Sequence, residues 1–340
     1  MITYGALANP WVGASARPVM GSLNPVAGFA HMVDHPFLRS AFLAGTCIAL
    51  AAGLVGYVVV LRGQVFTGDA LSHVAFTGAL AALAFGIDLR VGLYGACVVF
   101  ALLMAALGSR ANADDTVIGT VFAWILGLGA LFLSIFTTAR SGSGGAGGNA
   151  GVNVLFGSIL GLSSGQALSD AVVALCVTVA FIVIGRPLLF ASLDQAVAGA
   201  RGVPVRTLGY AFFVLLGITA GVATQAVGAL LLLGLLAAPA GASQRLTARP
   251  FVALWLSAGI AVVSMWAGLT LAYLAPSIPP SFGILAVATG AYLVAVLVTW
   301  WWQWRMQRRP GPMTRSSRSS RSTRPSGPID GSETGGLGAT

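Results

Sequence analysis

Long apolar stretches, separated by short charged segments, fill the chain from Arg39 to Arg305. A helix that crosses a membrane needs about 20 consecutive apolar residues. Some stretches fit one such helix and others fit a pair: 40–61, 70–87, 91–109, 116–139 and 168–185 for single helices, and 207–244 and 250–304 for pairs. We expect the two pairs to turn near Gln225–Gly228 and at Pro276–Pro280. The pattern predicts an all-α bundle of about eight or nine transmembrane helices, with nine as the simplest count.

The segments outside these stretches divide the chain into three parts. Residues 1–38 form a proline-containing pre-membrane segment without the features of a secretory signal. Residues 39–304 form the transmembrane domain. Residues 305–340 form a tail rich in Arg and Ser, expected to be disordered, whose basic half either contacts anionic lipid or stays solvated. Two more non-spanning regions are predicted, a flexible glycine-rich loop at Ser141–Gly151 and a partly helical loop at Pro187–Val205.

The composition supports a membrane location. Charged residues make up 8% of the 340 residues and hydrophobic residues 57%. A typical soluble domain has about 25% charged residues, so this chain lacks the polar side chains to cover a water-exposed surface. The net charge of +9 comes from arginines at the ends of apolar stretches and in the tail, so it does not indicate a nucleic-acid partner. The cysteines, Cys47, Cys97 and Cys176, lie inside apolar stretches and are expected to pack as small hydrophobic side chains.

The distribution of arginines predicts the orientation, because cytoplasmic loops are enriched in positive charge. With nine helices and a cytoplasmic C-terminus, only four arginines lie on the outer side: Arg17, Arg39, Arg90 and Arg140. We therefore expect the C-terminus inside the cell and the N-terminus outside. An eight-helix bundle would place both ends inside.

Two polar side chains stand near the start of the second apolar stretch. Asp69 and His73 are four residues apart, so a helix places them on one face. Ionisable residues inside a membrane usually line a transport path or meet a partner. A carboxylate and an imidazole are also a partial ligand set for Zn²⁺, Mn²⁺ or Fe²⁺, which suits a transit site that must release its ion. The alternative is that Asp69 caps the helix and His73 bonds to a neighbouring backbone.

Other polar groups give weaker indications. His31 and His35 flank Asp34 before the first stretch, where a solvated helix is favoured over an outer metal-handling patch. Asp170 is the other acid that qualifies as intramembrane. No HExxH, GxSxG or GxxxxGK[ST] motif is present, so we expect no enzymatic activity and no ATP hydrolysis by the chain itself. Uphill transport would draw its energy from a partner or an ion gradient.

Five segments carry motifs that occur together in one family. They are VVVLRGQVFTGDALSHVAFTGALAAL (Val58–Leu83), DDTVIGTVFAWILGLGALFLS (Asp114–Ser134), VNVLFGSILGLSSGQAL (Val152–Leu168), DQAVAGARGVPVRTLGY (Asp194–Tyr210) and VGALLLLGLLAAPAGASQRL (Val227–Leu246). Their order and content resemble the zinc/manganese/iron-type ABC transporter permeases, from about Arg39 to Gln303. The resemblance implies an importer fold like that of vitamin B12 and siderophore importers.

The resemblance also implies a transport system in the bacterial cytoplasmic membrane. Such permeases act as pairs, of identical or paralogous copies, with two ABC ATPase subunits inside and a metal-binding protein outside. Zinc, manganese or iron would pass through, and no cofactor would be held permanently. Asp69 and His73 fall on the family's metal-path positions, and Thr77 stands where the family often has proline.

The segment from Asp194 to Val205 resembles the coupling helix that docks in a groove of the ATPase. Four residues match the family pattern there: Asp194, Ala198, Gly202 and Pro204. Ala196 and Gly199 stand where the family usually has an acidic residue and an arginine.

Three hypotheses about the function of this chain make different predictions. A permease subunit of an ATP-driven importer requires an ATPase partner. A self-sufficient secondary transporter or channel would work without one, although that class usually shows more intramembrane acids or an inverted repeat. A non-transporting scaffold would tolerate loss of Asp69 and His73.

Overall fold

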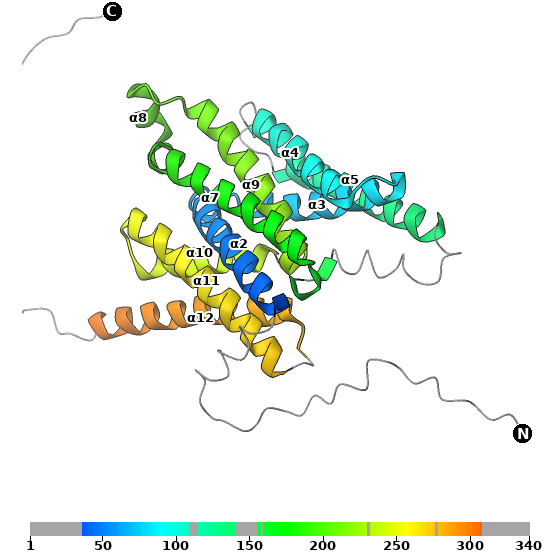
Figure 1. Ribbon diagram of the computed structural model, residues 1–340. Coiled ribbons are helices and arrows are strands. Elements are labelled where there is room, and N and C mark those ends of the chain that lie inside the picture. Colours follow the sequence, from blue (N-terminus) through cyan, green and yellow to red (C-terminus); the bar gives the residue numbers. More distant parts are fainter. Residues whose placement is uncertain are drawn as a thin grey trace, which may run out of the picture. The chain divides into compact units, whose positions relative to one another are not determined.

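The computed structural model describes residues 36–108, 115–139, 155–157, 159–229, 232–275 and 278–307, and over these ranges the regular secondary structure is entirely helical (Figure 1). The elements are α2 (Pro36–Leu61), α3 (Val65–Phe85), α4 (Leu89–Gly108), α5 (Asp115–Ala139), η1 (Ile159–Gly161), α7 (Ser164–Leu193), α8 (Gln195–Ala200), α9 (Val205–Val227), α10 (Leu232–Leu246), α11 (Pro250–Leu274) and α12 (Pro280–Gln307). The expectations for His31, Asp34 and His35, for Ser141–Gly151 and for most of the tail fall outside the described residues.

Eight of the described helices are long and apolar enough to cross a membrane. The predicted turns are confirmed, because α9 ends at Val227 and the α11–α12 break lies between Leu274 and Pro280. The remaining predicted helix, α10, has only 15 residues. At about 1.5 Å per residue it spans about 22 Å, less than the roughly 30 Å hydrocarbon core. The eight candidate spans therefore confirm the predicted eight or nine helices at the lower number over the described residues, with α10 as a shorter helix.

Helix α7 is longer at both ends than the predicted stretch 168–185. Its start is fixed by a capping box, in which Ser163 and Gln166 exchange side-chain and backbone hydrogen bonds. Its end lies at Leu193, so the loop predicted from Pro187 is wrong in its first part. Proline removes one backbone donor from a helix. Here the helix continues because Leu188 and Leu189 are buried in the core immediately after Pro187.

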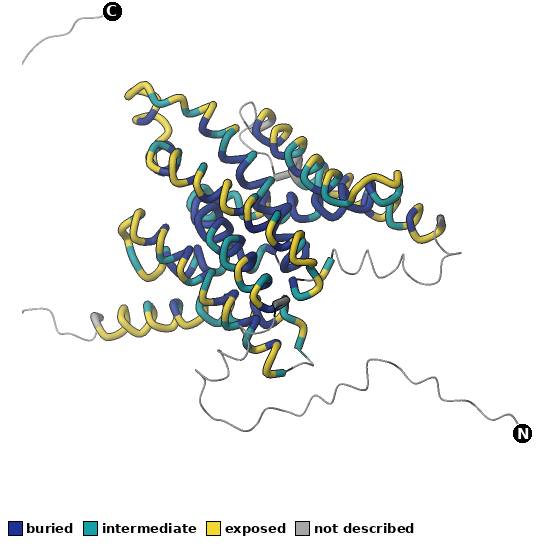
Figure 2. Tube along the Cα trace, viewed as in Figure 1, coloured by how far each residue is buried: buried dark blue, intermediate teal, exposed yellow. Residues whose placement is uncertain are grey.

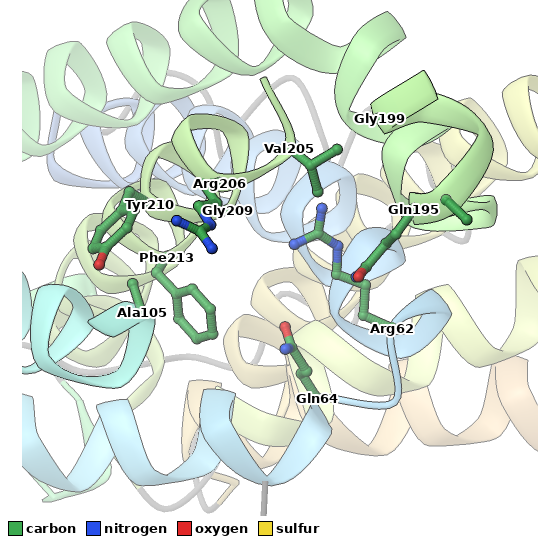
Figure 3. Close-up of a pocket in the computed structure, with 11 residues that line it drawn as sticks. Arg62, Gln64, Ala105, Gln195, Gly199, Val205, Arg206, Gly209, Tyr210 and Phe213 are labelled. Atoms are coloured by element: carbon green, nitrogen blue, oxygen red, sulfur yellow. The ribbon is translucent and has the colours of Figure 1, made fainter. Parts of the chain in front are cut away.

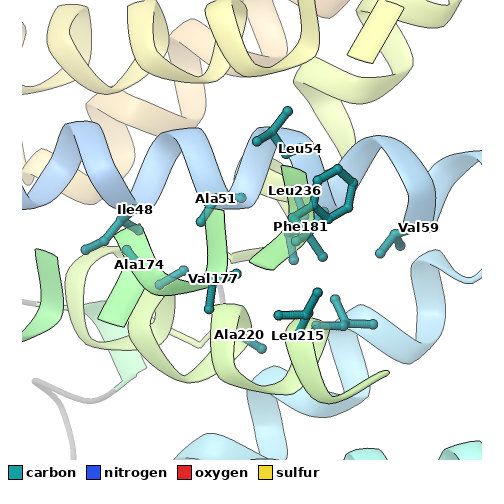
Figure 4. Packing of buried hydrophobic residues seen from close by; sticks show 14 of the residues in the cluster. Ile48, Ala51, Leu54, Val59, Ala174, Val177, Phe181, Leu215, Ala220 and Leu236 are labelled. Carbon is teal, nitrogen blue, oxygen red and sulfur yellow. The ribbon is translucent and has the colours of Figure 1, made fainter. Parts of the chain in front are cut away.

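Helix α2 lies at the centre of the first compact unit, which extends to Trp300. It packs against α7, α9, α10 and α11, and Figure 2 shows it largely buried. Figure 4 shows the side chains that fill this core: Ile48, Ala51, Leu54 and Val59 of α2, Ala174, Val177 and Phe181 of α7, Leu215 and Ala220 of α9, and Leu236 of α10. Alanine is the most frequent residue in this core, which allows the helices to approach closely.

Glycines make the closest helix contacts. A Cβ atom built at Gly56 of α2 would lie 2.3 Å from the carbonyl oxygen of Leu236 in α10. A Cβ built at Gly78 of α3 would lie 2.5 Å from the carbonyl oxygen of Gly92 in α4. Both distances are shorter than van der Waals contact, so backbone meets backbone at these crossings. This is the small-residue packing that membrane helices use in place of a hydrophobic driving force.

The second compact unit begins at Trp301, and its described part is the end of α12. There the Arg305 guanidinium lies 3.8 Å from the centroid of the Trp301 ring, a cation–π contact. Trp301, Trp302 and Trp304 are exposed. Exposed tryptophans at the end of a membrane helix are typical of the interface between lipid and water.

Candidate functional site

Helix α3 carries the candidate metal-path residues. It follows a tight turn in which Gly63 adopts a positive φ of 68°, and it ends at Gly86 in the left-handed conformation. Most of its residues are buried, whereas Asp69 and His73 are half-buried. The predicted common face is thus present, and it is the less buried side of α3.

Helix α5 lies beside this face. The His73 ring meets the Phe122 ring edge-on, with centroids 5.2 Å apart, and Phe66 contacts the same ring at 5.4 Å. Thr77 donates a hydrogen bond to the carbonyl oxygen of Ile125, at 3.2 Å. The threonine at the family's proline position therefore ties α3 to α5, and α3 runs unbroken past it.

Asp69 does not have the capping role that the structural alternative gave it. The N-cap of α3 is Gln64, without a side-chain cap bond, so Asp69 is not a capping residue. Ser72 Oγ donates a hydrogen bond to the main-chain carbonyl oxygen of Asp69, at 2.6 Å. No hydrogen bond of the Asp69 carboxylate is found among the described residues. The carboxylate of Asp69 and the ring nitrogens of His73 thus remain available as donor atoms for a ligand.

Among the residues that the structure describes, these two side chains do not make a complete metal shell. Over the described ranges, no cluster of three or more His, Cys, Asp or Glu residues is present. Structural Zn²⁺ sites have four ligands, and Mn²⁺ prefers six. A bound ion at this pair would therefore need ligands beyond these two side chains.

The segment between α7 and α9 is shaped by the residues that match the coupling motif. The Asp194 carboxylate accepts a hydrogen bond from the Val197 N–H at 2.9 Å and so caps the short helix α8. Gly202 follows with a φ of 78°, a conformation that favours glycine. Pro204 then precedes the first residue of α9 as its N-cap. These three residues set the sharp path of the chain through the segment.

Ala198, the fourth residue that matches the coupling motif, has a packing role. It is fully buried and anchors α8 to the bundle, whereas the other α8 residues are exposed. Val197 and the preceding Leu193 are exposed apolar side chains. The surface open to a partner therefore includes the matched residues Asp194, Gly202 and Pro204, which are exposed, together with these apolar side chains, which the motif comparison did not identify.

A polar cluster joins the starts of α4 and α7. Asp170 is 1% exposed, and its carboxylate forms an ion pair with Arg90 at 3.4 Å. Tyr94 donates a hydrogen bond to the same carboxylate at 3.4 Å, and Arg90 also donates to Ser169. The sequence identified Asp170 as an intramembrane acid but not its partner, because Arg90 lies 80 residues away.

The helices, their glycine contacts and the capped α8 segment together define a multi-pass protein of the cell membrane with the fold of an ABC importer permease. Residues 34–299 match the model of the ABC 3 transport family, and the chain belongs to that family.

Named relatives and a solved structure agree with this assignment. The "Manganese transport system membrane protein MntC" of Halalkalibacterium halodurans is 28% identical over 275 residues, or 80% of this chain and 87% of that protein. The "Manganese import system permease protein ScaB" of Streptococcus parasanguinis is 28% identical, covering 70% of this chain and 82% of that protein. The structure described as "PsaBC from Streptococcus pneumoniae in complex with Fab" has a similar fold, with a TM-score of 0.68 and 24% identity, and covers 79% of this chain and 95% of that one.

Proposed function

We propose that this chain is the permease subunit of an ATP-driven importer and that it passes a divalent transition-metal ion into the cytoplasm. The observation that carries the proposal is the pair Asp69 and His73 on the half-buried face of α3, with donor atoms that no described residue engages. Membership of the ABC 3 transport family supports the same role.

Manganese is the ion that we propose first. A carboxylate oxygen and an imidazole nitrogen suit Mn²⁺, Fe²⁺ and Zn²⁺, and among the described residues no cysteine joins them in a cluster of three or more metal-ligating side chains that would favour a softer ion. The relatives MntC and ScaB carry manganese in their names. Zinc and iron are the competitors that the experiment must rank.

The incomplete ligand pair supports a second permease copy as a partner. If two copies place their α3 faces together, two Asp69 carboxylates and two His73 rings supply four donors. Such a shell binds an ion on arrival and loses it when the two faces separate. The copies are either identical or paralogous.

The α8 segment supports an ATPase partner. Val197 of α8 and Leu193 at the end of α7 are exposed apolar side chains that suit insertion into a groove. The buried Ala198 transmits the movement of the segment to the bundle. We assign the outer delivery of the ion to a metal-binding protein and the driving force to ATPase closure.

Metal uptake tests the proposal. Radiolabelled Mn²⁺ uptake is measured in cells without other importers, with Zn²⁺ and Fe²⁺ as competitors. We expect His73→Ala and Asp69→Asn to abolish saturable uptake at unchanged membrane abundance. Asp88→Asn is the matched control, since Asp88 is exposed in the turn after α3. Equal uptake in all variants and in a strain without the gene would refute metal import, and uptake that persists without the ATPase would indicate a secondary transporter.

A further inference from the structure

A cavity lies between the short helix α8, the ends of α2, α4 and α9 and the start of α3, and its lining does not include Asp69 or His73 (Figure 3). Its volume is about 620 Å³. This is within the range of roughly 300–1,000 Å³ that small-molecule sites occupy. The residues that line it are Arg62, Gln64, Ala105, Gln195, Ala196, Gly199, Val205, Arg206, Gly209, Tyr210 and Phe213.

The charged side chains among the described lining residues are both positive. Arg62 and Arg206 contribute two guanidinium groups, and among the described residues no Asp or Glu lines the cavity. Figure 3 shows both guanidinium groups turned toward the space between α2 and α9. Among the described residues, the one ion pair in the structure joins Arg90 and Asp170, so neither cavity arginine has a carboxylate partner. Two such cations in one recess repel each other and attract an anion.

Arg62 is held in place for this role. Its Nε donates a hydrogen bond to Ser192 Oγ at 2.8 Å, and its guanidinium lies 4.6 Å from the centroid of the Phe212 ring. Burial lowers the pKa of Arg62 from its ordinary value, because the charged form has lost part of its hydration. An arginine nevertheless stays protonated at neutral pH. The described contacts engage Nε and the ring face, and the two Nη atoms remain for a ligand.

The uncharged lining adds specificity. The Gln64 side-chain oxygen is buried and has no hydrogen-bond partner among the described residues. An amide that rotates by half a turn offers its NH₂ group to the same place, as a donor to an anion. Phe213 and Tyr210 form an aromatic wall beside the arginines. The cavity therefore combines two guanidinium groups, one side-chain amide and an aromatic wall.

We propose that this cavity binds a phosphate-bearing anion between Arg62 and Arg206. Guanidinium forks match phosphate oxygens in pairs and give charge-assisted hydrogen bonds. The volume exceeds that of a phosphate group alone, so the aromatic wall has room for an organic part. The anion is either a soluble phosphate compound or the headgroup of an anionic lipid, and both present the same chemistry to the arginines.

Binding would connect two parts of the permease that move in the proposed transport cycle. Arg62 belongs to the turn before α3, and Arg206 lies in the first turn of α9, directly after the α8 segment. An anion held by both would tie the α3 turn to the coupling segment. This consequence rests on the proposed function, whereas the binding itself does not.

Anion-dependent stabilisation tests the binding. The full-length chain is placed in nanodiscs of phosphatidylcholine alone, and its unfolding midpoint is followed while inorganic pyrophosphate is added against chloride of equal ionic strength. A parallel set of nanodiscs contains phosphatidylglycerol and no pyrophosphate. A rise in the midpoint with pyrophosphate identifies a soluble anion, and a rise only with phosphatidylglycerol identifies a headgroup.

Substitution of the arginines makes the test specific. Arg206→Gln, at an exposed position, should weaken the stabilisation about 10–100-fold in apparent affinity. Arg62→Gln should act in the same direction, although its buried contacts make it the second choice. Arg186→Gln is the matched control, since Arg186 is exposed on α7 and does not line the cavity.

Two results would overturn the proposal. One is an equal response of wild type and Arg206→Gln to both pyrophosphate and phosphatidylglycerol. The other is no phosphate response in the free permease together with weaker ATPase binding by Arg206→Gln, which would assign the cavity to an acidic side chain of the ATPase. Failure of metal transport in the uptake assay would leave this binding result unchanged, so the two proposals fail separately.

Discussion

Replacing Arg90 with methionine removes the cation from a carboxylate that is 1% exposed. At the observed 3.4 Å, two unit charges attract by about 5 kcal/mol when the effective dielectric constant is about 20. Breaking a buried pair by removing one partner typically costs about 3–5 kcal/mol. Because Arg90 is 25% exposed and partly hydrated, we expect Arg90→Met to lower the free energy of unfolding by about 3 kcal/mol, at the low end of that range.

The double variant Arg90→Met with Asp170→Leu tests the cause of that loss. Without the carboxylate, no buried charge is left unpaired, and apolar replacements of buried pairs are often neutral. We therefore expect the double variant to recover at least half of the stability that Arg90→Met loses. The assay is denaturant unfolding in detergent micelles, followed by tryptophan fluorescence, with the exposed Arg249→Met as the control. The reasoning fails if Arg90→Met unfolds like wild type. It also fails if the double variant loses as much free energy of unfolding as Arg90→Met and Asp170→Leu, each measured alone, lose together.

Two other predictions follow from the backbone. Gly56→Ala places a methyl group 2.3 Å from the carbonyl oxygen of Leu236 and should cost about 1–3 kcal/mol or more, whereas Gly95→Ala, with open space at its Cβ, should leave the unfolding midpoint unchanged. Gly202→Asp strains the positive φ after α8 and adds a charge to its exposed surface, so we expect normal insertion but loss of ATPase stimulation and uptake. Normal values of both in purified transporter would contradict the role of α8 in coupling.

The positions of the helices could be predicted from the sequence because hydrophobic length alone sets the limits of a membrane span. The stretch 116–139 corresponds closely to α5, and the breaks at Gly228 and Pro276–Pro280 appear as expected. The extent of α7 could not be predicted in this way. Its start depends on the Ser163 cap and its end on the burial of Leu188 and Leu189, which is a tertiary effect.

The candidate site, too, could be predicted from the sequence only in part. The spacing of Asp69 and His73 predicted their common face on α3, since a helical period is a local property. The contact between His73 and Phe122, the pairing of Arg90 with Asp170 and the two-arginine cavity all join helices that are distant in sequence. No local pattern carries that information.

The backbone crossing at Gly56 limits how this protein can change over generations. When a substitution enlarges a side chain at a helix contact, a smaller residue on the facing helix often restores the packing. At Gly56 the facing atom is the Leu236 carbonyl oxygen, which every amino acid carries. A genetic screen for second-site suppressors of Gly56→Ala should therefore yield none at position 236. Restored growth should come only from reversion to glycine or from changes that shift α10 as a whole.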